Sequence, residues 1–394
     1  MDFALDPETE QLRELVAAIG EREIAPYIAE WDRAETFPAA FNAVCAQAGL
    51  LGGVLDEKYG GSGMSYLQMA VVLEELGYFC SMAGLVCGQP SCSLGRGLVL
   101  YADDAQLDAY LRPTLAGQRI GATAVTEAHS GTDVLKRMQT TARRDGDSYV
   151  LNGSKAWISN LVNADWFITF ATVDKSAEHR GVCAFVVDKS MAGLSVHPYH
   201  EKVGARTFVS GDLVLDEVRV PAANRVGAEG EGYKVLLAGS ESGRLSCAAR
   251  AVGQLRRVLD LARRYATERI VFDAPIARYE LVQDKIARMS TSLQAARLLT
   301  YRAAWLTDQG NTRLQKETSA AKSFATDALF AAADDAMQIF GAYSCSDEYE
   351  IGRIWRDARF SQIYDGANDV LSTVIGELEL GLRGGRPATA GAAR

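Results

Sequence analysis

Hydrophobic residues recur with two different spacings along the chain, and the changes in spacing mark three segments. In the first segment apolar residues return every three or four positions, as with Leu12, Leu15 and Ile19 after the helix-start signal at Pro7. This spacing places apolar side chains on one face of a helix. We therefore predict an N-terminal helical domain over residues 1–118.

The second segment consists of short runs of β-branched and aromatic residues separated by turn residues. These runs cover residues 148–160, 165–173, 181–188 and 211–221. Because no helical pattern of about ten residues separates them, the segment does not fit a βαβ unit and favours antiparallel strands. The pair Asn152-Gly153 is typical of a hairpin turn. We predict a small antiparallel β domain over residues 119–228.

Helical spacing returns in the third segment and continues almost to the end of the chain. The apolar series Val282, Ile286 and Leu293 is one example, and long helices joined by short loops form bundles. The prediction is a C-terminal four-helix-type bundle over residues 229–382. Residues 383–394 are rich in Gly and Ala and are predicted to be a disordered tail. The fold class is therefore α+β, mostly α.

The composition excludes several classes of protein. The chain has 394 residues, a net charge of -9 and no long stripe of lysine or arginine, so we expect no nucleic-acid partner. No apolar run approaches the ~18 residues that a membrane span needs, and the acidic N-terminus does not resemble a signal peptide. These features predict a cytoplasmic protein without membrane contact. The seven cysteines are irregularly spaced and the four histidines form no H-E-x-x-H pattern, so we expect reduced thiols and no metal site.

The most informative short stretch is IYDGAND, residues 363–369. Its carboxylate, Asp365, follows the apolar-aromatic pair Ile363 and Tyr364 and precedes Gly366. Partial burial raises the pKa of a carboxyl group toward working pH, which suits a general base. Taken alone, however, the stretch fits a helix start equally well.

Six blocks of sequence together carry more information than any one of them. They are AVTEAHSGTDV (124–134), LNGSKAWISNLVNAD (151–165), EKVGARTFVSGDLVLDEVRVP (201–221), AKSFATDA (321–328), QIFGAYS (338–344) and RIWRDARFSQIYDGAND (353–369). In this order, over about residues 5–380, they resemble the acyl-CoA dehydrogenase family. The resemblance implies the acyl-CoA dehydrogenase fold, FAD as cofactor and α,β-dehydrogenation of an acyl thioester.

The resemblance also implies where FAD would bind. It assigns Thr126 to the edge of the flavin ring, Trp157 to a wall of the isoalloxazine and Ser159 to its N5. Arg269 and Phe272 match residues that reach the cofactor of a neighbouring subunit, which implies a homo-oligomer, either a dimer or a tetramer. The complete set of implied cofactor-binding residues is Val125, Thr126, Gly131, Thr132, Trp157, Ser159, Arg269, Phe272, Gln338, Gly341, Ala367 and Asp369.

By the same resemblance Asp365 is the catalytic base and Arg244 is the arginine that orients the site. Taken alone, Arg244 fits a salt bridge within the bundle equally well. The family normally has a glutamate where this chain has Asp365. Some branches carry the base instead at the position of Gly243, which has no side chain to serve. The implied substrate-binding residues are Glu241, Tyr364 and Gly366.

The chain departs from the family pattern at further positions, and several functions stay open. Asp273, Ala342 and Ser344 replace glycines, and Ala367 replaces a threonine. The first expectation is a dehydrogenase of an acyl-CoA or acyl-carrier-protein thioester, with a flavin electron acceptor or dioxygen as the oxidant. The alternatives are a nitroalkane-oxidase-like enzyme, another flavin oxidase or monooxygenase, and a non-catalytic flavin-binding scaffold.

Overall fold

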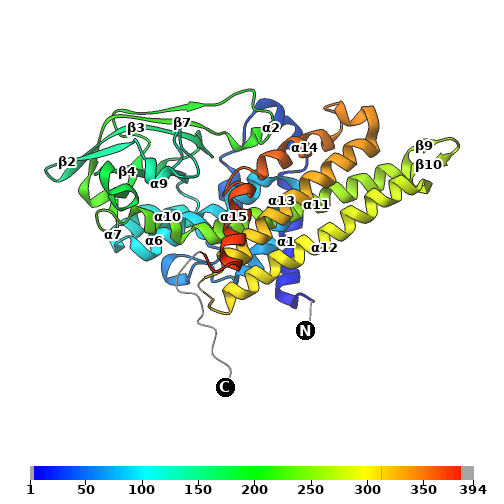
Figure 1. Cartoon of the computed structure of the whole chain (residues 1–394), viewed down its shortest axis with the longest axis horizontal. Helices are drawn as coiled ribbons and strands as arrows, with labels where there is room; N and C mark the ends of the chain where they lie inside the picture. The colour runs from blue at the N-terminus through cyan, green and yellow to red at the C-terminus, as the bar shows by residue number, and fades with distance from the viewer. Residues whose placement is uncertain (1–3, 312, 383–394) are drawn as a thin grey trace, which may run out of the picture.

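The computed structural model describes residues 4–311 and 313–382, which form an elongated molecule with a sheet at one end and long helices at the other (Figure 1). The predicted disordered tail, residues 383–394, lies outside the described residues. Among the described residues, no helix is both long enough and apolar enough to cross a membrane.

The first third of the chain is helical, as predicted. The first helix begins at Pro7, where the Asp6 carboxylate accepts a hydrogen bond from the Thr9 N–H at 2.8 Å. This cap satisfies one of the N–H groups that a helix start leaves unpaired. The helices are α1 (Pro7–Glu23), α2 (Ile28–Ala34), α3 (Phe41–Gln47), α4 (Tyr66–Phe79), α5 (Ser81–Gly88), α6 (Gly95–Tyr101), α7 (Asp104–Gln106) and α8 (Arg112–Leu115).

A twisted sheet follows, with the short helix α9 (Val134–Arg137) between its first two strands. The strands are β1 (Gly121–Ala124), β2 (Thr141–Asp145), β3 (Ser148–Ile158), β4 (Trp166–Thr172), β5 (Val182–Asp188), β6 (Leu194–Pro198), β7 (Gly211–Pro221) and β8 (Arg225–Val226). Their order is β6-β7-β3-β2-β4-β5-β8, with β1 beside β4. Most pairings are antiparallel, as expected, but β1 pairs with β4 in parallel and β2 meets β4 in parallel at one position. The sheet is therefore mixed rather than purely antiparallel.

The predicted hairpin at Asn152-Gly153 is wrong. Both residues lie inside β3, and the chain turns earlier, at Gly146 and Asp147 between β2 and β3. The Asn152 side chain accepts from the Glu217 N–H at 2.9 Å across a bulge in the β3–β7 pairing. A Cβ on Gly153 would lie 2.7 Å from the Thr140 backbone, so glycine serves close strand approach here.

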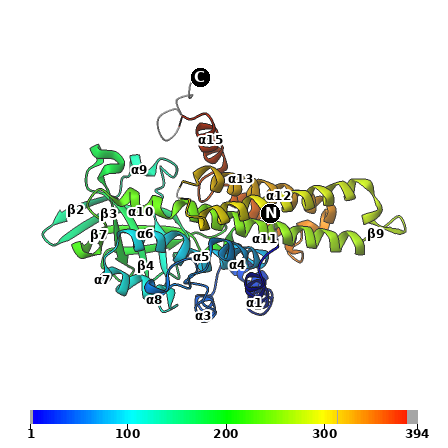
Figure 2. The same ribbon diagram turned by 90° about the horizontal axis from the view of Figure 1, so that it is seen from below.

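The last third forms the predicted bundle. Its elements are α10 (Gly232–Ala238), α11 (Ser240–Glu268), β9 (Ile270–Val271), β10 (Ala274–Pro275), α12 (Glu280–Asp308), α13 (Gln315–Phe340), α14 (Glu350–Ser361) and α15 (Asn368–Glu379). The β9–β10 hairpin projects at the end of the molecule farthest from the sheet (Figures 1 and 2).

The N-terminal helices and the bundle share a single hydrophobic core. That core contains Val72 and Leu76 of α4 together with Val252 of α11 and Leu329 of α13. Buried charges cross the same boundary: the Glu74 carboxylate on α4 accepts from the Arg297 guanidinium on α12 at 2.6 Å. The sheet, by contrast, has its own apolar clusters on either side of β4.

Candidate active site

The loop between α14 and α15, residues 362–367, holds Asp365 in a strained backbone conformation. The φ angle is 54° at Asp365 and 96° at Gly366. Aspartate is among the few residues besides glycine that visit this left-handed region, and such a conformation costs about 1–3 kcal/mol. It persists only where the surroundings fix the backbone.

Lys322 supplies that fixation from α13. Its side chain is fully buried, and its ammonium group donates to the Gly366 carbonyl at 2.8 Å and to the Asn368 side-chain oxygen at 2.9 Å. The Asn368 amide in turn donates to Asp327 at 2.7 Å and to the Thr326 hydroxyl at 2.9 Å. The α14–α15 loop is therefore fastened to one face of α13.

Replacing Lys322 with methionine should destabilise the protein by about 1–3 kcal/mol, because the Gly366 carbonyl loses a buried hydrogen-bond donor. Urea unfolding measures the change. Lys316→Met on the same helix is the control: its ammonium pairs with Glu379 at 2.7 Å but is 44 % exposed, so its loss should change stability little. Equal stability of wild type and the Lys322 variant would contradict this role.

The Asp365 carboxylate is open on one side and enclosed on the others. Its side chain is 42 % exposed, and its Oδ2 lies 3.5 Å from Nη2 of the buried Arg250. Burial raises the pKa of Asp365, and Arg250, Lys322 and Arg244 oppose that rise without cancelling it. A carboxyl group with a raised pKa and an accessible face is suited to take a proton from a bound molecule.

The start of α11 carries the expected residues Glu241 and Arg244, and Arg244 lies near this loop. A Cβ on Gly366 would lie 3.7 Å from Nε of Arg244, so Arg244 approaches the loop. The Glu241 carboxylate accepts from the Leu314 N–H at 3.3 Å, and burial raises its pKa. The position of Gly243 has space for a side chain, since only the Ser93 Cβ lies near a Cβ placed there, at 3.7 Å.

Sequence reasoning missed Arg250, the residue that forms the ion pair with Asp365. Its side chain is 1 % exposed, and its guanidinium lies over the Tyr364 ring at 5.5 Å. A signal was available: Arg250 is the one charged residue in the run Leu245–Leu255, in which every residue is buried. A charge in such a run needs a partner, because burying it alone is costly.

A chain of aromatic rings leads from the sheet to Asp365. Trp157 lies in a β3 bulge with φ at 60°, and its side chain is 52 % exposed. Its ring contacts Tyr199 (centroids 4.7 Å apart) and Phe360 of α14 (6.2 Å), and Phe360 contacts Tyr364 (5.4 Å). An exposed indole between sheet and bundle, within two ring contacts of Tyr364, fits a flavin's need for a flat apolar wall.

Polar groups expected at the flavin edge lie close to this indole. The Thr126 carbonyl accepts from the Ala156 N–H at 2.8 Å, which places the loop after β1 beside Trp157. A Cβ on Gly131 would lie 3.8 Å from the Thr126 methyl group. Of the other expected groups, Val125 and Thr132 lie in the same loop, Ser159 follows β3, and Ala367 and Asp369 lie at the start of α15.

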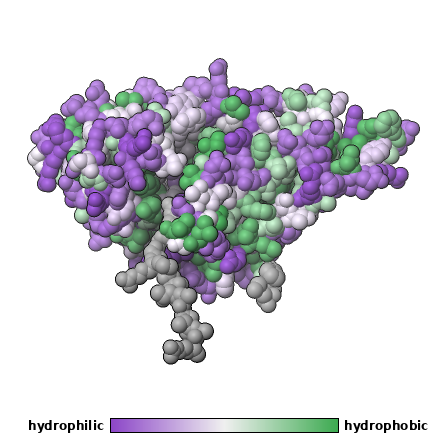
Figure 3. Space-filling model, in the orientation of Figure 1, coloured by the Kyte–Doolittle hydropathy of each residue, from purple (hydrophilic) through white to green (hydrophobic). Residues whose placement is uncertain are grey.

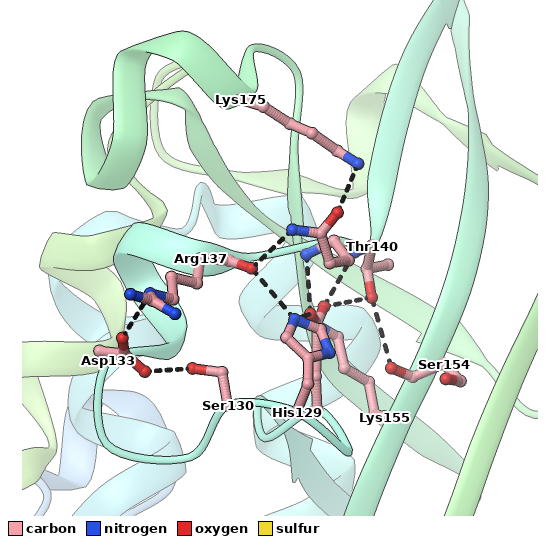
Figure 4. Close-up of polar contacts among 10 residues, drawn as sticks. His129, Ser130, Asp133, Arg137, Thr140, Ser154, Lys155 and Lys175 are labelled. Carbon is pink, nitrogen blue, oxygen red and sulfur yellow. Dashed lines mark hydrogen bonds and ion pairs between the residues drawn. The ribbon is translucent and has the colours of Figure 1, made fainter.

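A buried ion pair anchors the loop after β1. Glu127 Oε1 and Lys155 Nζ are 2.9 Å apart, with side chains 2 % and 0 % exposed (Figure 4). Glu127 also accepts from the N–H groups of Gln139 at 2.7 Å and Thr140 at 2.9 Å, and from the Thr140 hydroxyl. Three segments of the sheet region are thereby joined at one carboxylate.

Both members of this pair are charged at neutral pH. Burial raises the pKa of Glu127, but Lys155 and the hydrogen bonds from Thr140 and Gln139 outweigh burial and leave it below its ordinary value. Burial lowers the pKa of Lys155 to about 8. The pair therefore holds the loop as an ion pair.

The expected adenosine-side residues are not brought to Asp365 within one chain. Phe272 is 87 % exposed at the tip of the β9–β10 hairpin, where Figure 3 shows a hydrophobic patch, and the Arg269 guanidinium lies over the Tyr343 ring at 5.7 Å. Gln338 and Gly341 are also exposed, at the C-terminal end of α13. Whether they serve a neighbouring subunit stays a prediction.

Known families and structures match nearly the whole chain. The acyl-CoA dehydrogenase N-terminal, middle and C-terminal domains match residues 6–118, 122–218 and 230–379. The mitochondrial short-chain specific acyl-CoA dehydrogenase of Mus musculus is 35 % identical over 94 % of this chain and 89 % of its own length. Butyryl-CoA dehydrogenase from Megasphaera elsdenii has a TM-score of 0.91 and 33 % identity, covering 96 % of this chain and 100 % of its own. The prolyl acyl carrier protein oxidase AnaB has a TM-score of 0.90 and 31 % identity, covering 95 % and 100 %.

These matches define a flavin-dependent oxidoreductase that acts on CH–CH bonds. The chain belongs to the acyl-CoA dehydrogenase family. Its cofactor is FAD, and its reaction class is the dehydrogenation of acyl thioesters.

Proposed function

We propose that the protein removes the α-proton of an acyl thioester with Asp365 as the general base. The observation that supports this best is the setting of that carboxylate: a strained loop fixed by Lys322, one open face, and a pKa raised by burial. A base must be ionised at working pH yet basic enough to accept a proton, and a raised carboxyl pKa meets both needs.

The chain's own groups divide the remaining tasks. When bound, FAD would supply the acceptor for the β-hydrogen, which leaves the substrate as hydride. The indole of Trp157 and the groups of Val125, Thr126 and Ser159 would hold the flavin ring, together with Gly131, Thr132, Ala367 and Asp369. Arg269, Phe272, Gln338 and Gly341 would hold the cofactor of a neighbouring subunit.

On the substrate side, Glu241, Tyr364 and Gly366 would line the path of the thioester, and Arg244 would keep the α14–α15 loop in place. The developing negative charge on the thioester oxygen needs fixed donors, and the backbone N–H of Asp365 is our candidate. Tyr364 packs against Phe208 and Phe360, so that side of the site is apolar and would help to keep water from the reacting carbon.

The acyl carrier is part of the proposal. The relatives named above act on acyl-CoA in two cases and on an acyl carrier protein in the third, and we propose a short acyl-CoA as the first substrate to try. We further propose a cytoplasmic homo-oligomer, a dimer or a tetramer, that passes electrons to a flavin acceptor or to dioxygen. The exposed hairpin supports assembly because Phe272, an apolar side chain, is 87 % exposed at its tip.

The decisive experiment is anaerobic flavin bleaching. FAD-loaded protein is mixed with butyryl-CoA, longer and branched acyl-CoAs, a prolyl-carrier thioester and nitroethane, and absorbance at the flavin band is followed. Bleaching by a thioester supports the proposal, and the rates identify chain length and carrier. Bleaching by nitroethane alone, or a protein that binds no FAD, would overturn it.

Asp273→Gly should tighten FAD binding about two- to five-fold, because an exposed carboxylate near a pyrophosphate repels it weakly. Phe272 and Asp273 form a turn with φ angles of 50° and 60°, and glycine adopts these angles without strain. Titration of the apoprotein with FAD at low and high salt measures the change, which should shrink as salt rises. Asp260→Asn on α11 is the matched charge control. An unchanged affinity at low salt would place the hairpin away from the cofactor.

A further inference from the structure

Arg250 occupies a site built for a guanidinium group. On one side its Nη1 donates to the Ser81 hydroxyl at 3.2 Å and to the Ser81 carbonyl at 3.3 Å, and its Nε donates to the Ser246 carbonyl at 3.3 Å. On the other side its Nη2 lies 3.5 Å from Asp365 Oδ2. The planar fork is thus held at one edge by fixed acceptors and directed by its other edge at the carboxylate.

The neighbouring helices leave room for this side chain. A Cβ on Gly84 of α5 would lie 2.7 Å from both Cγ and Cδ of Arg250. A Cβ on Gly77 of α4 would lie 2.5 Å from the Arg250 carbonyl oxygen. Any larger residue at Gly84 would push the arginine stem, so the packing of α4 and α5 against α11 fixes where the guanidinium lies.

The distance between the two charges suits a working base. A charge-assisted hydrogen bond is about 2.7–2.9 Å long, and 3.5 Å is clearly longer. Arg250 therefore attracts the carboxylate from its buried side without occupying a lone pair in a tight hydrogen bond. The open side of Asp365 stays available to a substrate proton.

We propose that Arg250 is a positioning residue that orients the Asp365 carboxylate from behind, so that a short acid presents its free oxygen to the substrate. The proposal rests on the role of Asp365 as base. It assigns to Arg250 a task separate from that of Arg244, which approaches the loop at Gly366, and from that of Lys322, which fixes the loop backbone.

The charges around Asp365 determine the sign of the expected pH effect. Arg250, Lys322 and Arg244 face it as cations, and the neutral groups Cys247 and Tyr364 lie beside Arg250. Of the three cations, Arg250 lowers the pKa of Asp365 most. Without it the carboxyl group would protonate at a higher pH. Because only the ionised form accepts a proton, the acid limb of the rate profile would then move to higher pH.

The test is the pH dependence of anaerobic flavin reduction by butyryl-CoA, or by the thioester that reduces the wild-type flavin fastest. We expect Arg250→Met to slow reduction about 10²-fold, the usual effect of a misplaced reacting group, and to shift the acid limb upward. Arg250→Lys should recover about tenfold of that loss and restore the acid limb, because it keeps a charge but lacks the planar fork. Arg257, about two turns after Arg250 on the same helix, pairs with Glu350 instead of Asp365, so Arg257→Met should leave both the rate and the acid limb unchanged.

Two further measurements keep the outcomes distinct. If Asp365→Asn retains near-normal reduction, Asp365 is not the base and this inference falls with the proposed function. If Asp365→Asn is inactive but Arg250→Met keeps the wild-type rate and acid limb, the inference alone is overturned. Should the methionine variant fail to fold, the lysine variant decides: slower reduction with an unchanged limb supports positioning, and a wild-type rate overturns it.

Discussion

Asp365→Asn is expected to slow flavin reduction by a thioester about 10²- to 10⁴-fold, the range that a positioned general base contributes. Asparagine has the same shape and tolerates the left-handed backbone at this position, so the α14–α15 loop should stay intact. The measurement is single-turnover bleaching of the flavin under anaerobic conditions. Asp347→Asn, an acid 77 % exposed near Arg356, should react at the wild-type rate. Near-normal bleaching by the Asp365 variant would remove it as the base.

Replacing Asp365 with the longer glutamate tests the position of the same carboxylate. Glutamate would carry its carboxylate about 1.5 Å farther from the backbone. Since Arg250 fixes the shorter acid from behind, we expect Asp365→Glu to lose about 10²-fold on the natural thioester. The hypothesis is that the short acid accommodates a bulkier acyl group. It fails if the glutamate variant gains activity on straight-chain acyl-CoA while nothing bulkier reacts with wild type.

The second large effect, a loss of stability and of FAD retention, is expected from a substitution in the sheet. Lys155→Met would leave the Glu127 carboxylate buried without its cation, and breaking such a pair costs about 3–5 kcal/mol. Because Glu127 joins the loop that carries Val125 and Thr126 to the strands, FAD should also dissociate more readily. Chemical unfolding and FAD retention on gel filtration measure the two effects. Lys175→Met, which loses only an exposed contact with Gln139 (Figure 4), should be nearly neutral.

Acid should weaken the same anchor. The folded-state pKa of Glu127 lies below its ordinary value of 4.5, so its ionisation stabilises the fold above pH 4.5 and this contribution is lost as the pH falls through the folded pKa. The difference in melting temperature between wild type and Glu127→Gln should therefore shrink between pH 6 and pH 3. A constant difference would mean that the charge on Glu127 does not matter.

The sequence predicted the regular helices and strands well, but it did not predict the features that depend on contacts between distant segments. Helix α1 begins at Pro7 as expected because an N-cap and an apolar stripe are local signals. The hairpin predicted at Asn152-Gly153 was wrong because a bulge between β3 and β7 overrides the local turn preference. In this bulge Asn152 pairs with Glu217 on the other strand. The parallel pairing of β1 with β4 likewise depends on contacts between distant segments.

The candidate site shows the same division. Six ordered blocks were enough to single out Asp365, whereas Arg250 lies 115 positions before it and meets it only in the folded chain. The left-handed φ of Asp365 and the hydrogen bond from Lys322 to the Gly366 carbonyl also could not be predicted from the sequence pattern.

The core shared by α4 and the bundle has a consequence for how this protein is made. Glu74 and Arg297 are 223 positions apart, and the whole sheet is synthesised between the helices that they join. The apolar faces of the first helices therefore remain exposed to solvent until α11 and α12 have been synthesised. Contacts that form so late and between such distant segments slow folding and leave hydrophobic surface exposed. We therefore expect chains that end after the sheet to depend on chaperones and to aggregate when expressed alone.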